Sequence, residues 1–168
     1  PQWRGPDRTG ISAEKQLLKK WPENGPNRIW INSKMGLGYS SFAIVKGKLY
    51  TMGSRNRTEQ LICLDANTGA EEWTAKIGNE LQNGWGGGPR GTPTVDGQNI
   101  YAMGGQGNLI CTDLNGKIIW QASMSELGGK KPYWGYSESV LIDGDFALCT
   151  PGGNQGAIVA FNKKTGKI

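Results

Sequence analysis

Short apolar runs bounded by glycine or polar residues recur along most of this chain, and runs of this kind predict β-strands. One short helix is expected around Ala13–Lys20. Arg28–Asn32 alternates in character, as the last strand of a β-sheet blade would. The first full set of strand candidates is Phe42–Val45, Leu49–Met52, Gln60–Leu64 and Glu72–Ala75. The second set is Thr92–Val95, Ile100–Met103, Leu109–Thr112 and Ile118–Ala122, and the third is Glu138–Ile142, Phe146–Cys149 and Ala157–Phe161.

Glycine-centred turns separate the strands of each set. The first hairpin of each set turns at Val45-Lys46-Gly47, Val95-Asp96-Gly97 or Ile142-Asp143-Gly144. The last hairpin turns at Asn67-Thr68-Gly69, Asn115-Gly116 or Lys164-Thr165-Gly166. Tight hairpin turns need backbone with positive φ, which Asp-Gly and Asn-Gly supply. These residues therefore have a structural role.

Three tryptophans, Trp30, Trp73 and Trp120, recur at intervals of 43 and 47 residues. LICLDANTGAEEW ends at Trp73, LICTDLNGKIIW ends at Trp120, and IVAFNKKTGKI (Ile158–Ile168) begins a further copy. A period of this length is typical of four-stranded propeller blades. An aromatic residue in the outermost strand of each blade can cover the seam between blades. Asp65 and Asp113 repeat at one place in the pattern, which favours hydrogen bonds that cap the turns over catalysis.

The sequence therefore predicts an all-β fold, a β-propeller of four-stranded blades. The expected division is an N-terminal extension over 1–27 and a partial propeller over 28–168, with repeats at about 36–78, 84–124 and 133–168. About three blades are present, whereas a closed propeller needs roughly four to eight. We expect the chain to be part of a larger ring of seven to eight blades; the alternative is ring closure by another chain.

Composition and charge limit the kinds of partner that the chain is expected to bind. The 27 glycines and 8 prolines fit a turn-rich β protein. Lys and Arg outnumber Asp and Glu by 19 to 14, a net charge of +5, but the lysines occur in pairs at most and form no basic stripe with aromatics. This distribution favours a solvated surface over nucleic-acid binding. No apolar run is long enough for a transmembrane segment.

Candidate catalytic chemistry is sparse. With no histidine in the chain, a Ser-His-Asp triad, a Cys-His pair and a histidine metal site are all excluded. Cys63, Cys111 and Cys149 lack metal-ligand spacing, so no metal site is predicted. Buried free thiols are the expected state of all three, and a Cys63–Cys111 disulfide stays open. No catalytic residue is assigned.

The apolar strand, Thr-Gly turn and closing Trp resemble the PQQ-like (quinoprotein) β-propeller repeat. GPRGTPTVDG (Gly88–Gly97), WGYSES (Trp134–Ser139) and PQWRGPDRTG (Pro1–Gly10) are similar to bacterial secreted proteins of this type, often described after outer-membrane assembly factor B or quinoprotein alcohol dehydrogenases. The resemblance covers nearly all of the chain. It implies a periplasmic or secreted location and, for the dehydrogenases, pyrroloquinoline quinone with Ca²⁺.

Departures from that pattern weaken the enzymatic expectation. Quinoprotein alcohol dehydrogenases typically carry adjacent cysteines beside the quinone, and none occur here. Their calcium ligands and catalytic aspartate have no counterpart that we can match. Among rival propellers, WD40 repeats are disfavoured because the Gly-His…Trp-Asp signature is missing. Kelch repeats share double glycines, as at Gly104-Gly105, but fit the Thr-Gly turn less well.

The connections between blades hold the candidate site, because each one leads into an innermost strand near the central channel. They read GLGYSSF (Gly36–Phe42), GWGGGPRGTP (Gly84–Pro93) and GGKKPYWGYSES (Gly128–Ser139). Arg90 can bind a carboxylate or quinone oxygen. Trp134 or Tyr136 can stack on a planar ligand, with Thr92 and Ser137 to orient it. The remaining candidates near this mouth are Tyr39, Ser40 and Glu138; capping of the blades is the alternative role of all these residues.

Two functions follow from these observations. The first is an extracytoplasmic propeller domain that acts as a binding scaffold for a protein or small-molecule ligand through its loops. The alternative is a pyrroloquinoline-quinone-dependent dehydrogenase of alcohols or sugars.

Overall fold

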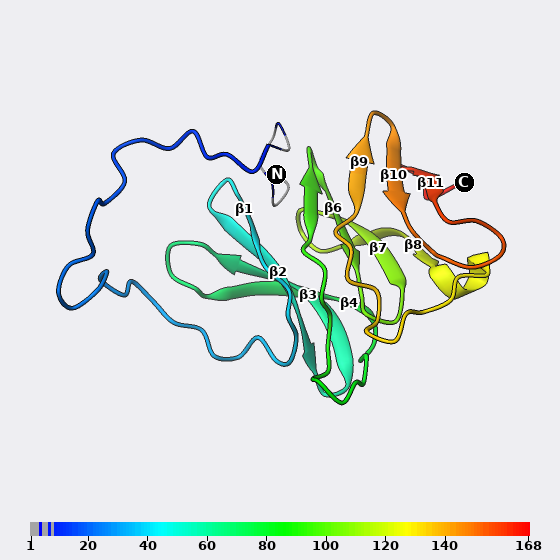
Figure 1. Cartoon of the computed structure of the whole chain (residues 1–168), viewed down its shortest axis with the longest axis horizontal. Coiled ribbons are helices and arrows are strands. Elements are labelled where there is room, and N and C mark those ends of the chain that lie inside the picture. Colours follow the sequence, from blue (N-terminus) through cyan, green and yellow to red (C-terminus); the bar gives the residue numbers. More distant parts are fainter. Residues whose placement is uncertain (1–3, 5–6, 8) are drawn as a thin grey trace.

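The computed structural model describes residues 4, 7 and 9–168 and contains three antiparallel sheets (Figure 1). The first comprises β1 (Ala43–Val45), β2 (Lys48–Arg55), β3 (Thr58–Asp65) and β4 (Glu71–Asn79). The second comprises β5 (Thr94–Asp96), β6 (Asn99–Met103), β7 (Asn108–Asp113) and β8 (Ile118–Ser123). The third comprises β9 (Leu141–Asp143), β10 (Phe146–Cys149) and β11 (Val159–Asn162). A 3₁₀ turn, η1 (Met124–Leu127), follows β8.

Each sheet is a meander in which sequential strands pair, so its order is the order of the chain. We call the three sheets blades 1, 2 and 3. The first strands β1, β5 and β9 contact one another in succession, so they lie on the same side of the stacked blades. All eleven predicted strands of the three sets are confirmed, with ends that shift by a few residues.

Alternation along the strands explains why the blades stack. In β3, Leu61 and Cys63 belong to the core between blades 1 and 2, where they pack with Ile100 and Ile110. Ile62 and Leu64 point to the other side of the same strand and pack with Trp30 and Met35. Because side chains alternate across a strand, a continuous apolar run lets one blade bury both faces.

The second core lies between blades 2 and 3. Tyr101, Leu109 and Cys111 meet Ala147 and Phe161 there. Cys63, Cys111 and Cys149 are all buried and free, so the disulfide that the sequence left open does not form. The expectation of buried thiols acting as small hydrophobic side chains is confirmed.

Two local expectations were wrong. No helix forms over residues 13–20, where Leu17 and Leu18 are exposed and have no apolar surface to cover. A helix this short is marginal in water without such packing. Residues 28–32 join no sheet, although the Trp30 side chain does dock on blade 1. In Figure 1 residues 9–34 run outside the sheets, and the chain first pairs with blade 1 at Leu37, which bridges Ser54 of β2.

The periodic tryptophans join each blade to its neighbour, as predicted. The indole nitrogens of Trp30, Trp73 and Trp120 donate to the carbonyl oxygens of Ala66, Leu114 and Lys163 at 3.0, 3.1 and 3.0 Å. Each acceptor lies at or beside the last hairpin turn of the following blade. The repeated turn residues Asp65, Asp113 and Asn162 accept backbone N–H bonds within their turns, which confirms the capping role expected for the two aspartates.

Candidate functional site

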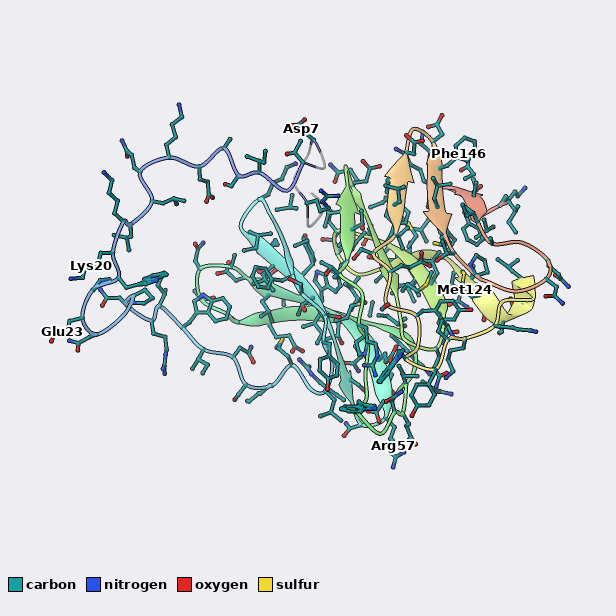
Figure 2. The ribbon with its side chains drawn as sticks, in the orientation of Figure 1. Asp7, Lys20, Glu23, Arg57, Met124 and Phe146 are labelled. Carbon is teal, nitrogen blue, oxygen red and sulfur yellow. The ribbon has the colours of Figure 1, made fainter. Side chains whose placement is uncertain are left out.

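The three connections between blades gather at one edge of the molecule. In Figure 2, Arg57 of the β2–β3 turn marks this edge, and Phe146 at the start of β10 lies at the opposite edge. We call the surface formed by the connections the inter-blade face. Its glycines allow close packing of backbone. A Cβ on Gly88, at φ +89°, would lie 2.4 Å from the carbonyl oxygen of Leu37.

Arg90 organises this face. Its Nε donates to the carbonyl oxygen of Trp134 at 2.5 Å, Nη2 to that of Gly86 at 2.9 Å, and Nη1 to that of Gly88 at 3.3 Å. The guanidinium carbon lies 5.1 Å from the centre of the Tyr39 ring, a cation–π distance. One side chain therefore ties all three inter-blade connections together.

Four side chains line an open hollow of about 400 Å³: Tyr39, Trp85, Arg90 and Trp134. We call this group the aromatic pocket. The centres of the Trp85 and Trp134 rings are 5.8 Å apart with their planes tilted by 55°, and the Tyr39 hydroxyl donates to the carbonyl oxygen of Trp85 at 2.6 Å. The Trp85 and Trp134 side chains remain 72% and 52% exposed. Neighbouring aromatic rings that remain this open to solvent are typical of a binding surface.

A more polar hollow of about 490 Å³ lies on the same face. It is lined by Leu37, Asn56, Arg57, Glu80, Gln82, Asn83 and Gly87. The segment 82–87 contributes to this hollow and, through Trp85, to the aromatic pocket. The amides of Gln82 and Asn83 and the carboxylate of Glu80 therefore lie close along the chain to the exposed Trp85 ring.

The other residues predicted for the site are placed differently. Tyr136 is buried in the core between blades 2 and 3, and its hydroxyl donates to the carbonyl oxygen of Pro151 at 2.7 Å. Burial raises the pKa of this phenol. The Glu138 carboxylate accepts hydrogen bonds from the backbone N–H of Thr150 at 3.0 Å and from the Thr150 hydroxyl at 2.7 Å. Both side chains thus bond residues that directly follow β10 of blade 3, and neither lines the aromatic pocket.

Thr92 and Ser137 also lie outside the aromatic pocket. The backbone N–H of Thr92 donates to the Ser139 hydroxyl at 3.0 Å, which links two connections, and Ser137 is exposed. Of the predicted set, Arg90 and Trp134 come together, with Tyr39 beside them. Ligand binding by any of these residues stays a prediction.

Sequence reasoning missed Trp85 and Tyr133. The Tyr133 ring lies 5.1 Å from the Trp134 ring, nearly perpendicular to it, and both missed residues are strongly exposed. The available signal was a large aromatic side chain within the glycine-rich run Gly84–Gly88. Such a side chain has little local structure to pack against, so it stays on the surface.

Across residues 4, 7 and 9–168, no group of three or more His, Cys, Asp or Glu side chains is placed to hold a metal ion. No helix within those same residues has the length and apolar character needed to cross a membrane.

Stacked antiparallel meanders of three or four strands, with tryptophan-sealed seams, define this chain as a protein of the PQQ-like β-propeller class. Residues 19–168 match the family model described as "Outer membrane protein assembly factor BamB". The chain belongs to this family. No match is found among curated proteins.

Two solved structures share the fold. The crystal structure of BamB from Moraxella catarrhalis is 20% identical with a TM-score of 0.52, and the match covers 77% of this chain and 36% of that one. A europium-containing methanol dehydrogenase is 17% identical with a TM-score of 0.57, and the match covers 82% of this chain and 25% of the enzyme. The chain thus spans about a third and a quarter of these proteins.

Proposed function

We propose that this chain is part of an extracytoplasmic binding scaffold that recognises a partner protein through the inter-blade face. The observation that carries the proposal is the aromatic pocket. Exposed Trp85 and Trp134 line this pocket beside Arg90, whose N–H groups bond the backbone carbonyl of Trp134 and those of Gly86 and Gly88, which follow Trp85 in the chain. The family match to an outer-membrane assembly factor supports a location outside the cytoplasm.

Preorganisation is the physical basis of the proposal. Binding normally costs free energy to immobilise side chains, and rings that are already fixed by neighbours lose little further freedom. Aromatic and arginine side chains also supply much of the binding energy at protein interfaces. The expected ligand is a peptide segment with aromatic or proline residues, whose rings can pack on Trp85 and Trp134.

The experiment is a titration of the protein labelled with 5-fluorotryptophan, followed by fluorine NMR. A pool of synthetic peptides rich in Phe, Tyr and Pro serves as the probe. We expect saturable shifts of the Trp85 and Trp134 signals, which single Trp→Ala variants assign. Trp134→Ala should abolish binding. Trp21→Ala, which removes an exposed tryptophan of the N-terminal segment, should leave binding unchanged.

Two results would contradict the proposal that the inter-blade face binds a protein. If no peptide moves the two signals, or if Trp134→Ala binds as well as the wild type, the scaffold proposal is wrong. Binding that is lost equally in Trp21→Ala and Trp134→Ala would place the recognition surface elsewhere.

The second candidate is a quinoprotein dehydrogenase of alcohols or sugars that uses pyrroloquinoline quinone with Ca²⁺. Its support is the fold shared with a methanol dehydrogenase. The described residues do not fit this pair of groups. The Trp85 and Trp134 rings are tilted by 55° against each other, so they do not form a pair of parallel faces for a planar ring, and no group of three or more His, Cys, Asp or Glu side chains gathers in the described part of the chain to hold calcium.

The same titration tests the second candidate. Pyrroloquinoline quinone with Ca²⁺ replaces the peptide pool, and dye reduction is measured with alcohols and sugars. Saturable, calcium-dependent binding together with dye reduction would establish the enzyme and overturn the misfit argued above.

A further inference from the structure

A buried carboxylate links blade 1 to structures outside its own sheet. Glu59, the second residue of β3, has 0% of its surface exposed. Its Oε1 accepts the backbone N–H of Leu81 at 2.9 Å, and its Oε2 accepts that of Gly105 at 2.8 Å. Leu81 belongs to the connection from blade 1 to blade 2, and Gly105 lies in the β6–β7 turn of blade 2. An ionised carboxylate is costly to bury unless such donors satisfy it.

The glycine pair Gly104-Gly105 makes room for this carboxylate. A Cβ on Gly104 would lie 2.3 Å from Oε2 of Glu59, far inside contact distance. A Cβ on Gly105 would lie 2.7 Å from the Cβ of Leu81 and 3.2 Å from Oε1 of Glu59. The double glycine after β6 therefore has a specific function, which is to admit the Glu59 side chain between the blades.

From Glu59, one chain of hydrogen bonds leads to Arg90. The carbonyl oxygen of Leu81 accepts the N–H of Gly88 at 2.9 Å, and the carbonyl oxygen of Gly88 accepts Nη1 of Arg90. Glu59 thus fixes the start of the segment that carries Trp85 and Arg90.

A second chain of contacts leads to Trp134. The carbonyl oxygen of Gly105 accepts the N–H of Tyr136 at 3.0 Å. Leu81 also packs against Gly135, where an added Cβ would come within 2.3 Å of its side chain. Gly135 directly follows Trp134 in the chain, and Tyr136 comes next. The two chains meet again where Nε of Arg90 donates to the carbonyl oxygen of Trp134.

We propose that Glu59 is the positioning residue of the inter-blade face, which holds Arg90 and Trp134 in their observed arrangement through Leu81 and Gly105. Its effect on ligand binding rests on the proposed function, but its effect on the arrangement does not. The charged groups that act on Glu59 are Glu80 and Arg90. Burial is the largest influence and raises the pKa of the carboxyl, while the two N–H donors and Arg90 oppose this shift.

The first test is a pH titration of the wild type by NMR. The amide protons of Leu81 and Gly105 should move with one common midpoint, which lies above the ordinary value for glutamate. The indole signal of Trp134 should follow the same midpoint, because its position depends on the carboxylate. A merely structural Glu59 would not couple Trp134 to this titration, so a Trp134 signal that is flat across the midpoint would overturn the proposal.

Glu59→Gln is the matched variant, because glutamine keeps the volume but turns an NH₂ group towards one of the two backbone donors. The amide that loses its acceptor should exchange with solvent on the order of tenfold faster. The common titration should disappear. Glu126→Gln, the same change at an exposed residue of η1, should alter neither result. Unchanged exchange at both amides in Glu59→Gln would contradict the proposal.

Peptide binding by the wild type and by Glu59→Gln distinguishes the positioning role of Glu59 from the proposed function. If Glu59→Gln loosens Leu81 or Gly105 and weakens binding of the peptide pool, both hold. If the wild type binds no peptide while the titration couples Glu59 to Trp134, the proposed function fails and the positioning role stands. Should Glu59→Gln fail to fold, the wild-type titration decides the matter alone.

Discussion

The indole nitrogen of Trp73 lies 3.1 Å from the carbonyl oxygen of Leu114, so the last strand of blade 1 is hydrogen-bonded to the last turn of blade 2. The Trp73 ring covers Gly116 of that turn, where an added Cβ would come within 2.5 Å of it. Trp30 with Gly69, and Trp120 with Gly166, repeat the arrangement. A tryptophan and a glycine, 43 residues apart in this pair, therefore act as one unit that joins neighbouring blades.

Gly116→Ala should destabilise the protein by about 2–4 kcal/mol. The backbone there has φ +82°, which costs an L-residue roughly 1–2 kcal/mol, and the methyl group also meets the Trp73 ring. Gly97→Ala is the matched control, because Gly97 has φ +58° and nothing within 4 Å of an added Cβ. Denaturant unfolding of both variants should show the larger loss for Gly116→Ala; equal losses would exclude a contribution from the ring contact.

Trp73→Phe tests the hydrogen bond of the same unit. Phenylalanine keeps an aromatic ring but leaves the carbonyl of Leu114 without the indole donor. We expect a loss of about 1 kcal/mol in the free energy of unfolding. Trp21→Phe changes an exposed tryptophan with no seam to cover and should be nearly neutral. A neutral Trp73→Phe would show that packing alone seals the seam.

These seams were predictable because the sequence repeats them. The spacing of Trp30, Trp73 and Trp120 predicted the blades, and the turn glycines predicted the hairpins, since both depend on local backbone geometry. The strand expected at Arg28–Asn32 did not form, because pairing needs a neighbouring strand that a local pattern cannot specify. Its tryptophan nevertheless docks as the pattern implied.

The site was less predictable than the fold. Arg90 and Trp134 could be placed at one mouth because each lies within a glycine-rich connection between blades. Tyr136 could not be separated from them, because its burial depends on a distant residue: a Cβ on Gly107 would lie 2.5 Å from its ring. The role of Glu59 was also hidden, since its two partners come from other parts of the chain and no motif surrounds it.

The three thiols should resist modification in the folded protein. Burial raises the pKa of Cys63 and Cys111 to about 12 and that of Cys149 further, so little thiolate exists near neutral pH. At pH 8 we expect negligible reaction of the folded protein with an aromatic disulfide reagent. In denaturant all three thiols should react, and the coloured thiolate that the reagent releases, three equivalents per chain, is measured by absorbance. Rapid reaction of one thiol in native buffer would indicate local opening of its core.

Stability should also depend on the ionisation of Glu59. Its folded-state pKa is raised above the ordinary 4.5, so the folded state binds the proton more tightly than the unfolded state. The contribution of Glu59 to stability is therefore fully present below pH 4.5 and is lost as pH rises through the raised pKa. Relative to Glu59→Gln, the wild type should lose stability over this interval, measured by denaturant unfolding at several pH values. A constant difference would show that the carboxyl titrates normally.

Arg90→Lys should loosen the inter-blade face without changing net charge. Lysine carries one compact ammonium group, whereas the planar guanidinium of Arg90 reaches the carbonyl oxygens of Trp134, Gly86 and Gly88 from three nitrogens. We expect a loss of roughly 1–2 kcal/mol in stability and faster acrylamide quenching of tryptophan fluorescence as Trp85 and Trp134 separate. Arg57→Lys provides the control, because Arg57 is exposed on the same face and its side chain is not part of this network. If both variants quench alike, the rings keep their positions through their own contacts with Tyr39 and Tyr133, and the organising role of Arg90 is refuted.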